Sequence, residues 1–170
     1  MTDKVVLLNN KALRQVAIPV DEVSVLFVNE TLLPKMIEVM KSEKGMGLAA
    51  NQIDDPHSVF ILDTNGELGI YLNPEILECS DEIVYDEGCL SIPGATAKVK
   101  RFNKLKLKYQ DEKLETKEID LEGIPAIAVQ HEVDHLQGML YIDHLGDLTK
   151  TMTLQRHRKY LKLRSRLGKR

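Results

Sequence analysis

The stretch Gln130-His131-Glu132-Val133-Asp134-His135 decides how the rest of the chain is organised, because it sets two histidines four residues apart. On an α-helix, residues four apart lie on one face, one turn above the other. Both imidazoles then reach a single metal ion, with the Glu132 carboxylate beside it as a proton acceptor. The stretch therefore predicts a metal-binding helix, and the third ligand decides what the metal does.

The sequence around this helix predicts an α+β fold with a mainly antiparallel sheet. The apolar period predicts helices over 22–42, 123–137 and 148–167. Strands are expected over 58–62, 68–72, 76–84 with breaks, 104–109 and 115–121. Pro125 is tolerated in the first turn of its helix, and Gly138 closes it. Pro34 either kinks the first helix or lies in the first turn of a helix starting near Thr31. The sheet is expected to surround the H-E-x-x-H helix, with an N-terminal helix and a long C-terminal helix.

Length and composition predict one catalytic domain over 1–170. The chain has 170 residues, of which 43% are hydrophobic and 29% charged, as in ordinary globular proteins. No apolar run reaches the roughly 18 residues that span a bilayer, and the first residues lack a signal-peptide pattern. Two cysteines make a disulfide framework improbable. We therefore expect a cytoplasmic protein with no membrane partner.

Charge is unevenly distributed along the chain. The net charge is −3, but residues 150–170 carry nine Lys or Arg and no acidic residue, which leaves −12 for residues 1–149. A basic C-terminal helix over about 148–167 indicates an anionic partner such as RNA. The same pattern is also typical of a solvated helix that balances an acidic body.

The third metal ligand is not supplied by the usual downstream patterns. Tyr141 stands where the extended three-histidine motif has its third His, and no Glu follows Glu132. Asp143 and His144 remain downstream candidates. Cys89 is the better candidate, because a thiolate with two imidazoles leaves a position open for water, as catalytic sites do.

The other residues of these types are interpreted as structural. Cys79 is expected to be a small buried residue. His57, His144 and His157 are interpreted as surface residues.

Three motifs together resemble the peptide deformylases, metal hydrolases that remove the formyl group from the initiating methionine of new bacterial polypeptides. Residues 45–52 fit G-x-G-x-A-A-x-Q, residues 87–91 read E-G-C-L-S, and residues 130–136 extend the H-E-x-x-H motif. The resemblance spans roughly residues 5–145. Asn51, Tyr85 and Gln137 depart from the usual pattern, and none of them is a proposed metal ligand or the base.

The resemblance implies a site with named roles. Cys89, His131 and His135 are the expected ligands of one divalent ion, Fe²⁺ in cells, with Zn²⁺, Ni²⁺ or Co²⁺ in purified protein. Such an ion lowers the pKa of its water to about 7, and Glu132 accepts the proton. The Gln52 amide and the Leu90 backbone N–H are the expected donors to the oxyanion.

The resemblance also implies a pocket and partners. The expected substrate-binding residues are Met46, Gly47, Tyr85, Gly88, Arg101, Ile124, Ile127 and Ala128. A surface salt bridge is an equal alternative for Arg101, and core packing for Ile124 and Ile127. The expected partners are a formyl-methionyl nascent peptide and, through the C-terminal helix, the ribosome; DNA is not expected.

Two other functions remain open. One is a zinc endopeptidase that uses Asp143 or His144 as third ligand. The other is a ribosome-bound module without activity, although ligands, base and oxyanion donor are all present in the sequence.

Overall fold

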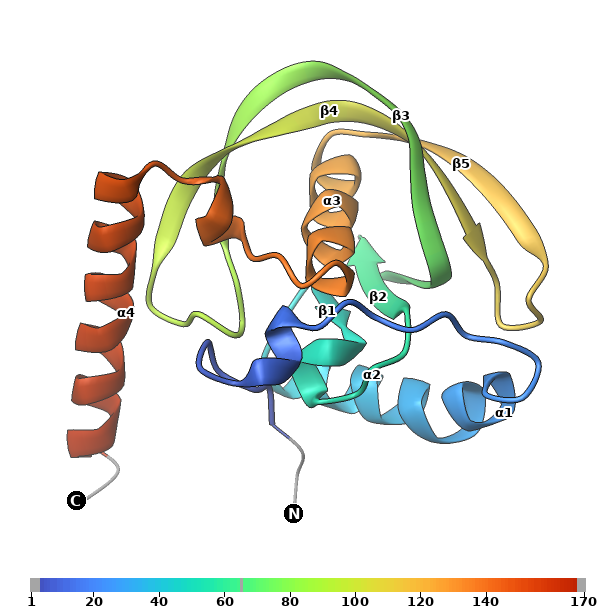
Figure 1. The fold of residues 1–170 in the computed structure, drawn as a ribbon, viewed down its shortest axis with the longest axis horizontal. Helices are drawn as coiled ribbons and strands as arrows, with labels where there is room; N and C mark the ends of the chain where they lie inside the picture. Colours follow the sequence, from blue (N-terminus) through green and yellow to red (C-terminus); the bar gives the residue numbers. More distant parts are fainter. Residues whose placement is uncertain (1–3, 65, 168–170) are drawn as a thin grey trace.

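A computed structural model describes residues 4–64 and 66–167, arranged as a twisted sheet over a central helix (Figure 1). The strands are β1 (Gly47–Ala49), β2 (Val59–Thr64), β3 (Glu67–Gly88), β4 (Thr96–Gln110) and β5 (Thr116–Glu122). The α-helices are α1 (Val25–Phe27), α2 (Leu33–Ser42), α3 (Ile124–Leu136) and α4 (Asp147–Leu167). Short helical turns are η1 (Lys11–Arg14), η2 (Val28–Leu32), η3 (Ala50–Ile53) and η4 (Tyr141–His144).

The five strands pair antiparallel in the order β1-β2-β3-β4-β5, which confirms the α+β class. Helix α3 lies under the arch of β3, β4 and β5, and α4 stands at the end of the β3–β4 hairpin (Figure 1). The prediction of α3 and α4 is correct to within one residue at each end. Gly123 caps α3, Pro125 lies in its first turn, and Gly138 follows with a positive φ of 72°.

The sheet differs from the prediction in three strands: one was split, one was missed, and β4 begins at Thr96 rather than at residue 104. The segments 68–72 and 76–84 belong to one strand, β3, whose register with β4 shifts twice, between Leu72 and Glu75 and between Ile76 and Glu78. These bulges absorb Asn73, whose φ is +48°, and Pro74, so pairing continues past residues that usually end a strand. Strand β1 has only three residues, too few for a pattern.

The N-terminal helix runs through Pro34 without a break. Between α1 and α2, the five residues of η2 form a π-helical turn, and Pro34 occupies the first turn of α2. Proline cannot donate a backbone hydrogen bond, and the wider π turn removes the need for the one it lacks. The alternative that placed Pro34 in the first turn of a helix is therefore correct, although α2 begins at Leu33 and follows α1 and η2 without a break.

The core lies on both sides of the sheet's inner strands. One apolar cluster joins α2 to β1 and β2, and a second joins α3 to β4. Helix α4 contributes little to either: Thr153 and His157 are its buried side chains, whereas Leu148 and Leu167 are 75% and 72% exposed. Most apolar side chains of α4 are therefore exposed. None of the helices in residues 4–64 and 66–167 combines the length and the apolar character that crossing a membrane requires.

Candidate metal centre and pocket

Helix α3 and the end of β3 bring three metal-binding side chains together. His131 and His135 lie one turn apart on α3 with ring centroids 4.9 Å apart. Cys89 follows β3 directly, and its Sγ lies 3.2 Å from His135 Nε2. One ligand atom from each of Cys89, His131 and His135 lies within 4.8 Å of the others. The three residues that the sequence indicated as metal ligands therefore lie close together in the fold.

The surroundings of the cluster fit a divalent cation. Glu87 Oε2 lies 2.9 Å from His131 Nδ1, so this nitrogen donates to the carboxylate and leaves Nε2 free for a metal. Glu132 Oε2 and His135 Nδ1 are buried without a hydrogen-bond partner among the described residues. One thiolate and two imidazoles suit zinc, iron, nickel or cobalt. The residues present thus fit the ion that the sequence implies.

Without a metal, the pKa values of the two histidines shift in opposite directions. Burial alone lowers the pKa of His131, but hydrogen bonds to Cys89 and Glu87 outweigh it and raise this pKa well above its usual value. Burial, with the charge of His131 nearby, lowers the pKa of His135 well below its usual value. Protons and a metal therefore compete for this cluster.

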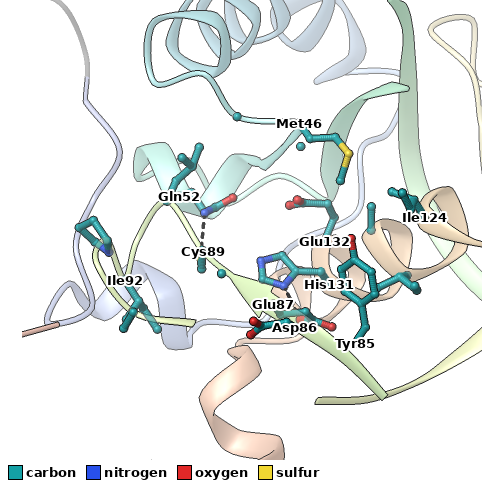
Figure 2. Close-up of a pocket in the computed structure, with 18 of the residues that line it drawn as sticks. Met46, Gln52, Tyr85, Asp86, Glu87, Cys89, Ile92, Ile124, His131 and Glu132 are labelled. Atoms are coloured by element: carbon teal, nitrogen blue, oxygen red, sulfur yellow. Dashed lines mark hydrogen bonds and ion pairs between the residues drawn. The ribbon is translucent and has the colours of Figure 1, made fainter. Parts of the chain in front are cut away.

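Glu132 is a buried carboxylate that lies beside the Cys89, His131 and His135 cluster. It is 5% exposed, and burial raises its pKa to about 7. Its side chain points into the space between Gln52 and His131 (Figure 2). Gly47 makes this placement possible, because a Cβ there would lie 2.3 Å from Glu132 Oε1. A carboxylate with a pKa near neutrality is suited to accept and return a proton.

Gln52 and Leu90 flank Cys89. The Gln52 amide oxygen accepts from the Ala49 N–H at 3.0 Å, which turns its Nε2 toward Ser91 Oγ at 3.2 Å and Cys89 Sγ at 3.5 Å (Figure 2). Leu90 follows Cys89 and lines the same pocket. Both expected oxyanion donors therefore lie beside the candidate ligand.

A pocket of about 360 Å³ opens over the cluster. Seven of the eight expected substrate-binding residues line it, namely Met46, Gly47, Tyr85, Gly88, Ile124, Ile127 and Ala128. Met46 and Ile124, 44% and 50% exposed, form its rim, whereas Ile127 is buried. Pro93, Gly94 and Ala95, in the loop after β3, form a further wall that the sequence did not indicate.

Arg101 is placed differently from either expectation. It is 4% exposed and does not line the pocket. Its Nε and Nη2 donate to Glu87 at 2.6 and 3.1 Å, and its Nη1 lies 2.8 Å from Asp134 Oδ2. Two carboxylates from different elements thus draw the guanidinium inward, where it forms a buried ion pair rather than a surface one.

The downstream alternatives for the third ligand lie outside the cluster. Asp143 accepts from Arg14, from Lys150 Nζ at 2.8 Å and from the Leu140 N–H at 2.9 Å. His144 Nε2 lies 2.7 Å from Asp134 Oδ2. Cys89 is the cysteine in the cluster.

Two interpretations of individual residues were wrong. Cys79 is exposed, not buried, because β2 pairs with β3 only as far as Leu72 and leaves β3 with one neighbour beyond it. His157 is 4% exposed, and its Nδ1 donates to the Pro93 carbonyl at 2.9 Å. His57 is partly buried and hydrogen-bonds Asp55 at 2.8 Å.

Glu87, Asn51 and Ser91 belong to the site although the sequence did not indicate it. Hydrogen bonds from His131 and Arg101 outweigh burial and lower the Glu87 pKa to about 2, so the carboxylate stays charged. Asn51 Nδ2 donates to the His135 carbonyl, and Ser91 Oγ accepts from Gln52. All three lie within the motifs at residues 45–52 and 87–91, and this position was the available signal.

An antiparallel sheet over an H-E-x-x-H helix, with a Cys-His-His cluster under a pocket, defines the class as a metal-dependent hydrolase. A model of the polypeptide deformylase family matches residues 2–151, and the chain belongs to this family. The Aquifex aeolicus protein named peptide deformylase is 39% identical, over 96% of this chain and 99% of that protein. A peptide deformylase 2 from Xanthomonas campestris is 37% identical, over 92% of each chain.

Solved structures of this family share the fold. The crystal structure of a Legionella pneumophila peptide deformylase superposes with a TM-score of 0.89 at 35% identity, over 98% of this chain and 99% of that one. A Synechococcus elongatus peptide deformylase, solved in complex with actinonin, has a TM-score of 0.84 at 30% identity, over 90% and 84% of the two chains.

Proposed function

We propose that this protein removes the N-formyl group from formyl-methionyl nascent polypeptides in the cytosol, releasing formate, with residues 1–170 acting as one catalytic unit. The observation that carries the proposal is the Cys89, His131 and His135 cluster with the buried Glu132 carboxylate beside it. Membership of the polypeptide deformylase family supports the same reaction.

The chain's own residues supply the proton transfers and the electrostatic stabilisation. In the proposal Cys89, His131 and His135 hold a divalent ion, which supplies an activated water near neutral pH when it is bound. Glu132 accepts the water's proton and later returns it to the leaving amine. The Gln52 amide and the Leu90 N–H donate to the oxyanion, where losing one donor typically costs about 10²–10³ in rate.

The pocket gives a place for the methionine side chain. Its apolar wall is formed by Ile124, Ile127 and Ala128 on α3, together with Met46 and with Tyr85 on β3. Figure 2 labels Met46, Tyr85 and Ile124. An unbranched thioether adapts to such an irregular apolar wall. We propose that the backbone of Gly88 lies beside the substrate. Arg101 makes no direct substrate contact in this proposal, because its guanidinium is held by Glu87 and Asp134.

Formate release from a formyl-methionyl peptide tests the reaction. We expect release by iron-loaded protein between about pH 6 and 8, and loss of release in E132A with the metal retained. Absence of formate from metal-loaded protein across this range would reject the activity. Internal cleavage of an unformylated peptide would favour the endopeptidase instead.

We propose Fe²⁺ as the ion used in cells. The thiolate and imidazole donors accept several first-row ions, so availability contributes to the choice. Loading the metal-free protein anaerobically with Fe²⁺, Zn²⁺, Ni²⁺ or Co²⁺ and comparing kcat/KM tests this assignment. A zinc form that clearly exceeds the iron form would overturn it.

We also propose that α4 docks the enzyme on the ribosome. Its outer face presents Arg158, Lys159, Lys162 and Arg166, all exposed, while Thr153 and His157 face the body. A row of cations on one helix face complements the phosphate backbone of RNA.

Charge-neutral substitutions test this docking better than deletion, because deletion also removes the His157 contact with Pro93. We expect R158Q/K162Q/R166Q to weaken ribosome co-sedimentation and to lower the salt slope by about 2–3. The variant K41Q/K44Q/K113Q carries the same charge change on exposed lysines elsewhere and should bind normally. Equal weakening by both variants would show a net-charge effect and reject α4 as the contact.

A further inference from the structure

A continuous line of charged hydrogen bonds leads from the metal centre to the protein surface. It starts at His131, whose Nδ1 donates to Glu87 at 2.9 Å. Glu87 accepts two hydrogen bonds from Arg101, at 2.6 and 3.1 Å. The third nitrogen of Arg101 lies 2.8 Å from Asp134, and Asp134 lies 2.7 Å from His144.

The line joins four separate elements. Glu87 is on β3, Arg101 on β4, Asp134 on α3 and His144 on η4. Exposure of the side chains rises along it, from 5% and 4% for Glu87 and Arg101 to 13% for Asp134 and 28% for His144. Its outer end therefore reaches solvent while its inner end is buried against a metal-binding imidazole.

Asp134 fixes the orientation of Arg101, because a guanidinium is planar and its nitrogens have fixed directions. Nε and Nη2 of Arg101 are committed to Glu87, and Nη1 is committed to Asp134. One oxygen of Asp134, Oδ2, receives both Arg101 and His144. Removing the His144 donor leaves Arg101 to hold that oxygen without its second donor, so the position of the carboxylate, and of the guanidinium that orients Glu87, is less firmly fixed.

We propose that Asp134 and His144 are positioning residues for the metal centre, acting on His131 through Arg101 and Glu87. This inference rests on the proposed ligand role of His131. His144 is neither among the residues that line the pocket nor part of the Cys89, His131 and His135 cluster, and its hydrogen bond to Asp134 connects it to the metal centre. It goes beyond the sequence interpretation of His144 as a surface residue.

Metal affinity is the quantity that such positioning changes. Loss of a hydrogen bond made directly to a ligand histidine typically costs about 10–100-fold in affinity, and we expect that range for E87Q. For the more distant D134N and H144A we expect weaker binding by about threefold to tenfold. H144Q keeps an N–H donor near the position of Nε2 and should restore most of the affinity.

The experiment measures Co²⁺ and Zn²⁺ dissociation constants by chelator competition, together with the visible absorption of the Co²⁺ form. H57A is the matched control, since His57 also pairs with an aspartate at 2.8 Å and is not among the residues that line the pocket or form the Cys89, His131 and His135 cluster. We expect H144A and D134N to weaken binding and shift the Co²⁺ spectrum, H144Q to resemble the parent, and H57A to change neither. Thermal unfolding of the metal-free proteins checks that each variant folds; if D134N does not fold, H144A decides.

Three results would each overturn the proposal. The first is a dissociation constant for H144A within twofold of the parent, the second is an equal change in H57A, and the third is no recovery in H144Q. A C89A variant measured alongside separates this failure from failure of the ligand assignment. If C89A loses the metal while H144A does not differ, the ligands stand and only the positioning role falls. If C89A binds metal as the parent does, the proposed ligand set itself is rejected.

Discussion

The metal centre and helix α4 are held in the molecule in opposite ways. Cys89, His131 and Glu132 come from two segments far apart in the sequence, and the fold surrounds them with buried partners such as Glu87 and Arg101. Helix α4 is one continuous segment, and over its described length Thr153 and His157 are its buried side chains. Its remaining contacts are at the surface.

This difference teaches where single substitutions have large effects. In the metal centre the ligand atoms of Cys89, His131 and His135 lie within 4.8 Å of one another, so one change alters the geometry of the whole cluster. On α4 most side chains face solvent, where substitutions usually change stability little. We therefore expect effects on activity to fall steeply from the cluster to the helix.

The two cysteines provide the largest expected contrast. C89A should lose bound metal, and its formate release should fall to that of metal-free protein, because the thiolate is one of three proposed ligands. C79A should keep both, since Cys79 is exposed on β3 away from the cluster. Metal analysis after gel filtration and a formate assay measure both outcomes. Retained metal and activity in C89A would contradict the Cys-His-His assignment.

A substitution at Gly47 tests how far the Glu132 carboxylate can move without loss of activity. A Cβ in G47A would lie 2.3 Å from Glu132 Oε1, so the carboxylate must move. We expect kcat to fall by about 10²-fold while metal content stays unchanged, because a shift of about 1 Å in a reacting group costs that much. G146A is the control, since a Cβ on Gly146 meets no atom within 4 Å. Normal kcat in G47A would show that Glu132 tolerates displacement.

The parts of this structure that were predictable depend on local patterns. Helix α3 follows from its apolar period with Pro125 and Gly138 at its ends, and the later part of β4 follows from alternation. Cys89 was identified because Tyr141 and the absence of a later Glu excluded the common third ligands. These inferences need only neighbouring residues and the chemistry of metal ligands.

The parts that were missed depend on distant partners. Arg101 is buried because Glu87 and Asp134 lie on either side of it. No local sequence pattern predicts that these two carboxylates meet the same guanidinium. His157 is buried because Pro93, 64 residues earlier, offers its carbonyl. Strand β3 continues through Asn73 because the Asn73 side chain bonds the Val20 backbone at 2.8 Å. In each case a tertiary contact overrides the local signal.

Asp143 pairs with Arg14 on η1 and with Lys150 on α4, and we expect its substitution to have an intermediate effect on stability. Burial alone would raise its pKa, but hydrogen bonds from Arg14, Lys150 and the Leu140 N–H lower it from 3.8 to about 2. An acid whose pKa is lower in the folded state stabilises that state above its unfolded pKa and loses this contribution as pH falls through the folded value. Solvent screens this partly exposed carboxylate, so D143N should be less stable by roughly 1.5 kcal/mol at pH 7, with unchanged metal content.

Urea denaturation of parent and D143N at equal metal loading measures this difference. We expect it to stay constant above about pH 5 and to narrow as the pH falls from about 4 toward 2. E82Q is the control, because the Glu82–Lys100 pair is exposed on both sides and should show no measurable change. A difference that persists unchanged at pH 3 would mean that Asp143 acts by packing rather than by charge.

His157 gives the smallest effect and tests how α4 is attached. Its Nδ1 donates to the Pro93 carbonyl, and the neighbouring Gly94 packs so closely on Tyr160 that a Cβ would lie 2.3 Å from Tyr160 Cγ. H157A leaves that carbonyl without its donor, which should cost about 1 kcal/mol of stability. Since Pro93 and Gly94 also line the pocket, KM should rise slightly while kcat stays constant. H157N, which retains a donor, should recover part of the stability. A large fall in kcat would instead show that α4 belongs to the catalytic machinery and that the two regions are not built independently.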